Sequence, residues 1–353
     1  MDHARRLDRL IAERERPLLV SSLINIRYLT GFTGTAAWLL VTPGGCVVAT
    51  DGRYGELAAE LATHLNDTRV EVSTSGMLDA LVGLIGDAPD VDLEADHVTW
   101  SFLTSLQAKV GATLHPSTGI VERHRMVKDA GEVAALAAAA AAGDTAFAAV
   151  AGTAGAAATE AELSDALIEA MVAAGGDRAG WPPIVAAGPN AARPHHQTGS
   201  GPIGAGLLLL DYGCTVDGYH SDMTRTVWLD GEPDAELRRL FDAVVESNRA
   251  GIAAVRPGAT GNDIDEACRV VLRTHGLEER FLHSTGHGVG LQIHEGPWAR
   301  RGSDDVLEPG HVLTVEPGAY LPGVGGVRIE DMVLVTDSGH RVLTTSPREL
   351  VTA

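Results

Sequence analysis

The sequence predicts an α+β protein in which an α/β domain over residues 1–125 precedes a larger domain over residues 126–353. A chain of 353 residues is long enough to bury two hydrophobic cores. Short apolar runs alternate with helical stretches through the first third of the chain, as in α/β folds. Near Met126 the composition changes to an alanine-rich segment, residues 129–151, which predicts one long packed helix because alanine is the best helix former.

Strands and helices alternate along the first domain, after a charged amphipathic helix at its N-terminus. The apolar runs PLLVSSL, AAWLLVT and GGCVVATD, within residues 17–51, predict three strands separated by turns. Residues 55–65 and 77–85 predict helices, and VEVSTS (70–75) and VDLEAD (91–96) predict two further strands.

Two similar helices are expected in the second domain. The segments ATEAELSDA (158–166) and ATGNDIDEA (259–267) resemble each other, and the first begins with a capping box at Thr159. Each is followed by a glycine, Gly175 or Gly276, that suits a helix C-cap. The repeat suggests a pseudo-two-fold arrangement, with chance similarity as the alternative.

The first strand pair of the second domain carries two aspartates. LLLLDY (207–212) and YHSDMTRTVWL (219–229) predict an antiparallel hairpin with GCTVDG as its turn, in which Asp211 lies opposite Asp222. The two Cβ atoms would be about 5 Å apart, where like charges repel unless a cation lies between them or one carboxyl stays protonated. The alternative is that one aspartate faces solvent at a hairpin end, but four leucines direct Asp211 towards a core.

A second strand pair repeats this plan. VLTVEPGAYLPGVGGVRIEDMVLV (312–335) predicts a strand that ends in Glu316, a loop rich in Gly and Pro, and a returning strand with Glu330. Two such hairpins are hard to explain as solvent-exposed accidents. Four carboxylates on adjacent apolar strands form an oxygen-rich site of the kind that divalent cations prefer.

Three histidines lie between the two hairpins, in HSTGHGVGLQIHEG (283–296). Glycines on both sides of His287 let the backbone bend, so that its imidazole can approach the carboxylates. His287 and His294 would lie on opposite faces of a regular strand, so both serve one cleft only through a bend. A single histidine is usually structural, but three beside a carboxylate cluster, with His283 the first, indicate a functional site. His294 and Glu295 are not part of an HExxH motif, which excludes a thermolysin-like zinc helix.

A further pair of histidines, His195 and His196, lies on the loop AAGPNAARPHHQTG (186–199), for which a plain surface loop is the alternative.

One imidazole and four carboxylates can hold two metal ions when two of the carboxylates bridge them. Two ions that share a water lower its pKa and give a hydroxide near neutral pH. A carboxylate can carry the proton, and histidines can stabilise an oxyanion, so the residues indicate hydrolysis of an amide or an ester.

The composition excludes several other classes of function. The formal net charge is −20, from 47 acidic and 27 basic residues, and no basic run is present, so no nucleic-acid partner is expected. Three separated cysteines argue against a disulfide framework. The N-terminus lacks the apolar core of a signal peptide, and no apolar run approaches the roughly 20 residues of a membrane span. We therefore expect a cytoplasmic protein with no membrane partner.

Five residues follow one another in an order that is typical of one group of metallopeptidases: Asp211, Asp222, His287, Glu316 and Glu330. With the motifs DYG…SDMTRT, TGHGVGLQIHE and VEPG…RIED, this order resembles the pita-bread metallopeptidases, which include methionine aminopeptidase, aminopeptidase P and prolidase. SLINIRYLTGFTGT (22–35) and TDGRY (50–54) resemble the N-terminal domain of the aminopeptidase P, prolidase and creatinase branch. The resemblance covers nearly the whole chain and implies a creatinase-like α/β domain followed by a pita-bread catalytic domain.

The resemblance also implies which residues bind metal. Asp211 would bind one metal ion, and His287 and Glu316 the other. Asp222 and Glu330 would bridge the two ions. The implied cofactors are two divalent metal ions, with manganese first and cobalt or zinc as alternatives.

The remaining site residues take catalytic or substrate-binding roles by the same resemblance. Glu316 would carry the proton of the metal-bridging hydroxide, and His195 and His294 would assist the tetrahedral intermediate. His283 and Arg328 are expected to bind substrate. The implied substrate is a peptide with proline at its second position, whose tertiary amide lacks an N–H, and the implied protein partner is a second copy in a homodimer.

One departure from the family pattern bears on specificity. Where many relatives carry arginine after H-E-x-P, this chain reads HEGPWARR and has Trp298. In prolidases that arginine helps to hold the terminal carboxylate of the substrate, for which Arg300, Arg301 or Arg328 could substitute. The change favours an Xaa-Pro aminopeptidase over an Xaa-Pro dipeptidase.

Three other functions are weighed against the Xaa-Pro peptidase. A non-catalytic module that binds peptides or proteins, and a creatinase-like hydrolase without metal, would both lack part of the ligand set, and all five ligands are present here. A plain methionine aminopeptidase would not need the N-terminal domain.

Overall fold

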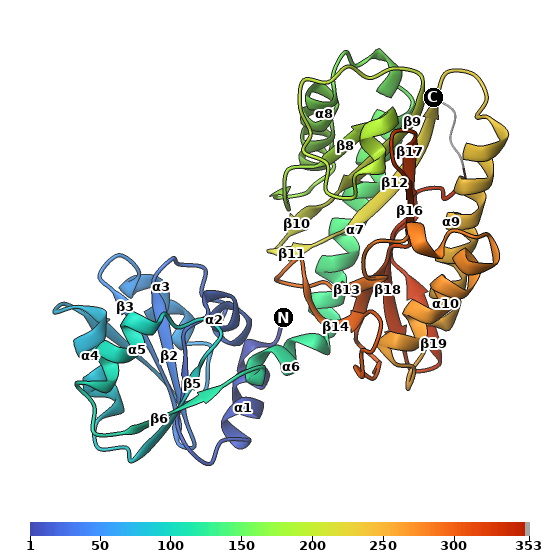
Figure 1. The fold of residues 1–353 in the computed structure, drawn as a ribbon. Helices are drawn as coiled ribbons and strands as arrows, with labels where there is room; N and C mark the ends of the chain where they lie inside the picture. Colours follow the sequence, from blue (N-terminus) through green and yellow to red (C-terminus); the bar gives the residue numbers. More distant parts are fainter. Residues whose placement is uncertain (350–353) are drawn as a thin grey trace. The chain divides into compact units, whose positions relative to one another are not determined.

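The computed structural model describes residues 1–349, and in it the chain forms two compact units, Met1–Arg125 and Met126–Ala353 (Figure 1). Both units combine helices with β-sheets around hydrophobic cores of their own, which confirms the predicted α+β class. Every predicted site residue belongs to the second unit, so the fold of that unit decides what the site can do.

The first unit is built on a six-stranded sheet in the order β4-β3-β2-β1-β5-β6. Its strands are β1 (Leu18–Val20), β2 (Ala37–Thr42), β3 (Gly45–Asp51), β4 (Thr68–Ser73), β5 (Asp90–Glu94) and β6 (Thr113–Ser117). Its helices are α1 (His3–Ala12), α2 (Leu23–Thr30), α3 (Gly55–Ala62), α4 (Met77–Ile85), α5 (Trp100–Gln107) and α6, which ends at the boundary (Ile120–Met126). Strand β2 is antiparallel to both of its neighbours, and the other pairs are parallel. The predicted strands and helices of this domain all form.

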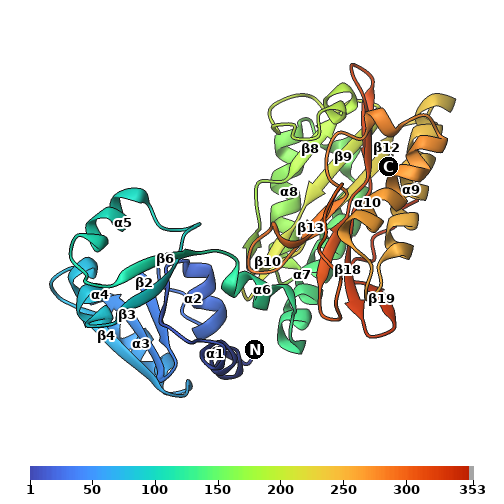
Figure 2. The same cartoon turned by 60° about the horizontal axis from the view of Figure 1, so that its bottom comes forward.

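Two helix pairs and two main sheets make up the second unit (Figure 2). The helices are α7 (Ala130–Ala151), which packs on α8 (Glu160–Ala173), and α9 (Ala235–Ala254), which packs on α10 (Gly261–Thr274). The first sheet is β12 (Met223–Leu229), β9 (Gly206–Tyr212) and β8 (Ile184–Ala187). The second is β14 (Glu295–Ala299), β13 (Gly286–Gly288), β15 (Val312–Val315), β18 (Asp331–Thr336) and β19 (Gly339–Val342). Short strands complete the unit: β7 (Arg178–Ala179), β10 (Cys214–Val216), β11 (Tyr219–His220), β16 (Gly318–Leu321) and β17 (Gly325–Arg328).

The two similar helices, α8 and α10, begin and end in the same way. The side chains of Thr159 and Thr260 each accept a hydrogen bond from the backbone N–H three residues on. In each case the acidic side chain of that residue accepts a hydrogen bond from the threonine's own backbone N–H, which completes a capping box. Each threonine also forms an isolated antiparallel bridge. The glycines after the helices, Gly175 and Gly276, have φ of 102° and 71°, the left-handed conformation that suits a C-cap. The predicted repeat is therefore matched at both ends of the two helices.

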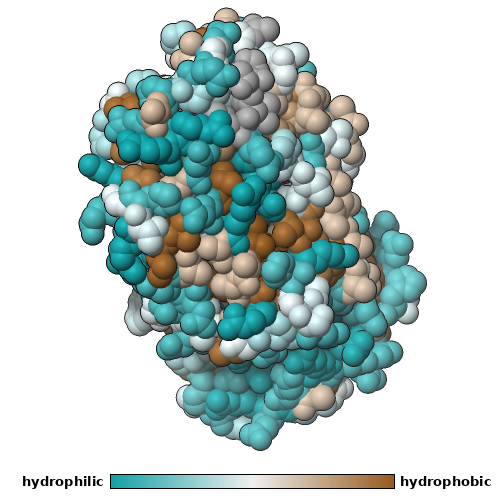
Figure 3. Space-filling model, turned by 90° about the vertical axis from the view of Figure 1, so that its right-hand side faces the viewer, coloured by the Kyte–Doolittle hydropathy of each residue, from teal (hydrophilic) through white to brown (hydrophobic). Residues whose placement is uncertain are grey.

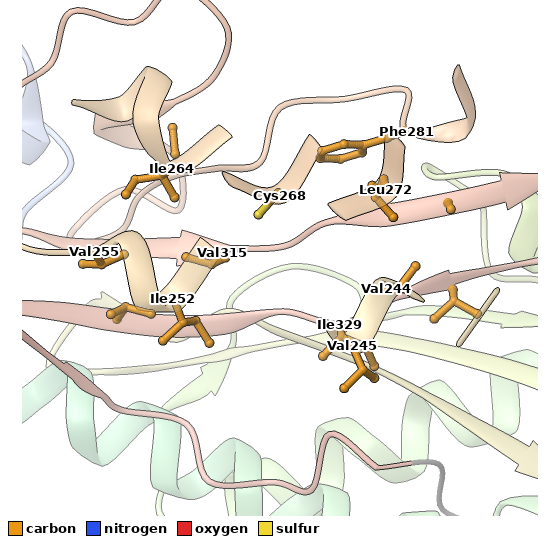
Figure 4. Close-up of a cluster of buried hydrophobic side chains, with 14 of the residues drawn as sticks. Val244, Val245, Ile252, Val255, Ile264, Cys268, Leu272, Phe281, Val315 and Ile329 are labelled. Atoms are coloured by element: carbon orange, nitrogen blue, oxygen red, sulfur yellow. The ribbon is translucent and has the colours of Figure 1, made fainter. Parts of the chain in front are cut away.

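The core beneath the five-stranded sheet fixes the backbone on which two carboxylates lie. Cys268 from α10 lies near Val315, the last residue of β15, in a cluster that also contains Ile329 (Figure 4). Val315 and Ile329 are both fully buried and directly precede Glu316 and Glu330. Burying an aliphatic side chain of this size contributes about 1.5–3 kcal/mol, so the chain is held firmly beside each glutamate.

The two predicted hairpins form with a different register and with extra strands. Asp211 faces Thr224 across β9 and β12, so the prediction that it lies opposite Asp222 was wrong. The reason is that the predicted turn GCTVDG contains β10, which pairs with β11 and makes a small hairpin of its own. In the same way, β16 and β17 form a hairpin within the predicted loop between Glu316 and Glu330. Both changes leave the carboxylates at the ends of strands.

Helix α7 is the one helix among residues 1–349 that is long and apolar enough to cross a membrane, which corrects the expectation that no apolar run approaches that length. Half of its apolar window is buried, and Phe147 joins the core that also contains β9 residues, as in a core helix of a globular domain. On the face of the molecule drawn in Figure 3, hydrophilic side chains surround smaller apolar patches.

Candidate metal centre

A cavity of about 400 Å³ in the second unit brings together all the predicted site residues. Its lining contains Asp211, Asp222, His287, Glu316, Glu330, His195, His283, His294 and Arg328. Trp181, Ile184, Ile293 and Trp298 add apolar and aromatic walls. The fold therefore joins, in one cavity, the two strand pairs and the two histidine segments that are separate in the sequence.

The four carboxylates lie at the ends of paired strands. Asp211 lies near the C-terminal end of β9, and Asp222 directly precedes the partner strand β12. Glu316 directly follows β15, and Glu330 directly precedes its partner β18. Asp222 and Glu330 are buried, and the other two are partly buried. Apolar strands thus carry four acidic groups into a buried or partly buried position.

His287 lies in β13, between β14 and β15. Its Nδ1 lies 3.1 Å from the carbonyl oxygen of Gly288, which can only accept, so Nδ1 carries the proton and Nε2 presents its lone pair. Burial lowers the pKa of His287 to about 4, so the ring is neutral at pH 7. Nε2 lies 3.5 Å from Glu316 Oε1 and 3.6 Å from Asp222 Oδ2. A lone pair that faces two carboxylates is unfavourable unless a cation binds between them.

The charges of the cluster also call for a cation. Ligand atoms of Asp222, His287 and Glu330 lie within 4.8 Å of one another. Burial, with repulsion from neighbouring carboxylates, raises the pKa of Glu330 to about 8 and raises the pKa values of Asp222 and Glu316 well above their ordinary range. Protons must neutralise such a group when no metal does, and a divalent cation would replace them. The residues therefore fit a metal site.

Arg328 connects one carboxylate to the surrounding polar groups. Its guanidinium donates to Asp211 Oδ2 at 2.6 Å, to the Tyr320 hydroxyl at 2.9 Å, to Thr224 Oγ1 at 3.1 Å and to the Pro194 carbonyl at 3.3 Å. Burial alone would lower the pKa of Arg328, but Tyr320 and the nearby carboxylates outweigh this and raise it. The guanidinium is therefore a permanent positive charge beside Asp211. Burial nevertheless leaves the pKa of the Asp211 carboxyl raised.

His283 ends a hydrogen-bond chain that begins at Arg328. Its Nε2 lies 2.8 Å from the Tyr320 hydroxyl, and its Nδ1 lies 2.8 Å from the carbonyl oxygen of Ser284. Nδ1 therefore donates to the carbonyl, and Nε2 accepts from the hydroxyl. Burial, and then the charge of Arg328, lowers the pKa of His283 to about 3, so the ring is neutral. His283 and Arg328, the two side chains predicted to bind substrate, thus already form hydrogen bonds with other residues of the chain. This favours a role in holding the site together.

The two remaining histidines, His195 and His294, are exposed side chains on separate segments that line the cavity. The ring centroids of His294 and His287 are 4.2 Å apart, with the rings edge to face. Strands β13 and β14 are antiparallel, so the connection between them, residues 289–294, reverses the chain and provides the predicted bend. Burial lowers the pKa of His294.

Three hydroxyl-bearing residues of the site were missed by reasoning from the sequence. Thr224 donates to Glu330 Oε2 at 2.7 Å, Thr314 accepts from the backbone N–H of His287 at 3.1 Å, and Tyr320 links Arg328 to His283. All three lie within the two strand-pair segments that the sequence marked as functional. A hydroxyl gives no signal of its own there, because threonine and tyrosine are also common in ordinary strands.

Comparisons with known proteins agree with this arrangement. The family model "Metallopeptidase family M24" matches residues 134–337, and the model "Creatinase/Prolidase N-terminal domain" matches residues 6–127. An uncharacterized peptidase of Bacillus subtilis, YqhT, is 34% identical over 345 residues, which cover 95% of each chain.

Two solved structures share the fold of the whole chain. The Xaa-Pro dipeptidase from Bacillus anthracis has a TM-score of 0.94 and 33% identity, over 99% of this chain and 100% of its own. The X-Pro aminopeptidase from Thermotoga maritima has a TM-score of 0.88 and 30% identity, again over 99% and 100%. Peptidases named for both activities therefore resemble this chain.

Proposed function

The chain belongs to metallopeptidase family M24, with a creatinase/prolidase N-terminal domain before the pita-bread catalytic domain, and on this premise we propose that it is a dinuclear Xaa-Pro aminopeptidase. Membership confirms the predicted family, fold and enzyme class. The proposal concerns what membership leaves open. These are the number and kind of metal ions, the roles of the residues, and the choice between aminopeptidase and dipeptidase.

Two divalent cations would be held by the five predicted ligands: Asp211, Asp222, His287, Glu316 and Glu330. The observation that carries this proposal is the Nε2 lone pair of His287, which faces Asp222 and Glu316 in a buried carboxylate cluster. When bound, the cations supply an activated water near neutral pH and polarise the scissile carbonyl. An oxygen-rich set with one imidazole suits manganese, and cobalt or zinc are alternatives.

The residues around the cations would move a proton and hold the substrate oxygen. Glu316 would take the proton of the attacking water, as the family resemblance implies, because a carboxylate beside that water can accept a proton. His195 and His294 would donate hydrogen bonds to the scissile carbonyl oxygen as negative charge develops on it, because a neutral imidazole keeps one N–H donor. We assign His283 and Arg328 to holding Asp211 and the Tyr320 hydroxyl in place, in revision of their predicted substrate-binding role.

Specificity depends on which cavity residues contact the substrate on the C-terminal side of its proline. A dipeptide has a free carboxylate at this position, whereas a longer peptide has a neutral amide. Among the described residues that line the cavity, Arg328 is the one arginine or lysine, and Asp211, Tyr320 and Thr224 already engage it. A dipeptide carboxylate would thus lack a strong cationic partner, which favours the aminopeptidase.

The residue at the usual arginine position supports the same choice. Trp298 lines the cavity there as an apolar wall. Of the possible substitutes, Arg301 is paired with Glu278 at 2.6 Å, whereas the guanidinium of Arg300 lies 5.3 Å from the Trp298 ring centre. A prolidase activity that uses Arg300 is therefore the alternative function.

The test compares a dipeptide with a tripeptide on the same metal-restored protein. The protein is stripped with chelator and restored with Mn²⁺, and the release of alanine from Ala-Pro and from Ala-Pro-Ala is timed. We expect manganese-dependent cleavage of the tripeptide, at a rate at least about tenfold above that of the dipeptide. The reverse preference would make the chain a prolidase. No cleavage of either peptide with any divalent metal would favour a non-catalytic binding module.

The assembly and the location of the protein belong to the same proposal. We expect a homodimer, as the family resemblance implies, and a cytoplasmic enzyme. Light scattering coupled to size-exclusion chromatography tests the dimer, and a mass equal to the 36.8 kDa of one chain would contradict it.

A further inference from the structure

The short loop that carries His195 is held on both sides of this residue. On one side, Arg328 donates to the carbonyl oxygen of Pro194 at 3.3 Å. On the other side, His196 Nε2 lies 2.8 Å from Glu160 Oε2. His195 lies between these two fixed neighbours and lines the cavity.

Glu160, the first residue of α8, ties the whole loop together. Its side chain is 1% exposed. Oε1 accepts from the backbone N–H of Ala187 at 2.9 Å and from Asn190 Nδ2 at 2.8 Å, and Oε2 lies beside His196. The backbone N–H of Glu160 also donates to the carbonyl of Gly201 at 3.0 Å. One residue therefore binds the start, the middle and the end of the segment 187–201, which contains His195.

These bonds are not needed to form the helix. The capping box of α8 is made by Thr159 and Glu162, so the inward direction of the Glu160 side chain serves another purpose. Burial would raise the pKa of Glu160, but the hydrogen bonds from Ala187, His196 and Asn190 outweigh it and hold the pKa below its usual range. The helix N-terminus also favours a negative charge at this position. The carboxylate is thus kept ionised where it can hold the loop.

We propose that Glu160 and His196 are positioning residues that fix His195 in the cavity for the peptidase reaction. The proposal rests on the proposed function, in which His195 donates a hydrogen bond to the substrate oxygen. Alignment of such a donor matters, because a displacement of about 1 Å can cost on the order of 100-fold in rate.

A double-mutant cycle on the manganese-loaded full-length protein tests this coupling. The variants are His196→Ala, His195→Ala and both together, assayed on whichever of Ala-Pro and Ala-Pro-Ala is cleaved faster. We expect His196→Ala to lower kcat/KM about tenfold alone, but less than about twofold when His195 is already absent. Equal losses in the two backgrounds, or no loss from His196→Ala alone, would overturn the proposal.

Two further variants make the cycle decisive. His275→Ala removes a His–Glu pair of similar length, 3.0 Å to Glu246, from the surface of the same unit and should leave kcat/KM unchanged. Glu160→Gln keeps the size of the buried side chain and should show the same coupling to His195, so the proposal stays testable if His196→Ala does not fold.

Hydrogen exchange separates failure of this inference from failure of the proposed function. If the native protein cleaves neither peptide, the proposed function fails, and exchange of the loop residues 188–201 then decides the inference alone. Faster exchange in His196→Ala and Glu160→Gln, together with a shift of the His195 ring signals in NMR, would support it. Exchange rates and ring signals equal to those of the native protein would refute it.

Discussion

Asp211, His287 and Glu330, three of the metal-ligand candidates, have hydrogen-bond partners that orient them or fix their chemical form. The carbonyl of Gly288 sets the tautomer of His287, Thr224 donates to Glu330, and Arg328 donates to Asp211. Partners of this kind orient the ligands, and their loss typically costs about 10–100-fold in metal affinity or activity. The proposed centre would therefore depend on hydroxyl, carbonyl and guanidinium groups as well as on its five candidate ligands.

Replacing Glu330 with glutamine should remove one of the carboxylates proposed to bridge the metal ions while keeping the size of the side chain. We expect Glu330→Gln to retain less Mn²⁺ after dialysis and to lose at least about 100-fold in kcat/KM, or about 3 kcal/mol of transition-state stabilisation. Elemental analysis and steady-state kinetics measure the two effects. Asp242→Asn, which breaks an exposed pair with Arg238 on α9, is the matched control. A Glu330→Gln protein with native metal content and activity would contradict the dinuclear centre.

Replacing Trp298 with arginine should add the cation that a dipeptide carboxylate lacks in this cavity. A charge-assisted hydrogen bond contributes about 1.5–3 kcal/mol, so the ratio of kcat/KM for Ala-Pro over Ala-Pro-Ala should rise at least about tenfold. Competition between the two peptides in one reaction measures the ratio directly. Trp100→Arg, at a side chain 80% exposed in the first unit, is the control and should leave the ratio unchanged. No change in Trp298→Arg either would mean that this position does not set specificity.

The elements around the site could be predicted from the sequence, but their pairing could not. Apolar runs ending in acidic residues, separated by turn residues, predicted both strand pairs. Register depends on the connection between strands, and the extra strand β10 placed Thr224, not Asp222, opposite Asp211. The bend between His287 and His294 could be predicted. Residues seven apart lie on opposite faces of a regular strand, so both side chains reach one cleft only if the chain bends between them.

Close packing of β13 makes its glycines indispensable. A Cβ at Gly288 would lie 2.0 Å from the carbonyl oxygen of Gly296. Gly288→Ala must therefore push β13 from β14, at a cost of about 1–3 kcal/mol, and shift His287 with it. Calorimetry should show a lower Tm, and titration should show weaker Mn²⁺ binding. Gly152→Ala, where nothing lies within 4 Å of the added carbon, should change neither, and equal behaviour of the two variants would refute this account.

At the scale of the whole molecule, nine residues that line the cavity could be named from the sequence, whereas the polar network that holds them could not. Arg328 and Asp211 are 117 positions apart, and Tyr320 and His283 are 37 apart. Such contacts depend on which strands become neighbours, and no periodicity or spacing encodes that. The role of Glu160 was hidden for the same reason, since its sequence context is that of an ordinary helix start.

The buried carboxylates should make the stability of the metal-free protein fall as the pH rises. With the pKa of Glu330 raised to about 8, and those of Asp222 and Glu316 raised as well, the folded chain keeps protons that the unfolded chain has lost at pH 7. The free energy of unfolding then falls by about 1.4 kcal/mol per pH unit for each such carboxyl. Below about pH 6.5 buried histidines oppose this trend, since burial lowers the pKa of His283 to about 3 and those of His287 and His311 to about 4.

The window from about pH 6.5 to pH 8 therefore isolates the carboxylates, and bound metal should remove the trend within it. Because Mn²⁺ displaces the retained protons, its stabilising effect should grow with pH. Denaturant unfolding at both pH values, in chelator and in Mn²⁺, measures the gap in the free energy of unfolding between the metal-free and the Mn²⁺-bound protein. We expect the gap to widen by about 2 kcal/mol or more at the higher pH, and by less in Glu330→Gln, which lacks one titrating group. A metal-free protein that gains stability across this window would mean that the four carboxyls do not share protons as a buried cluster.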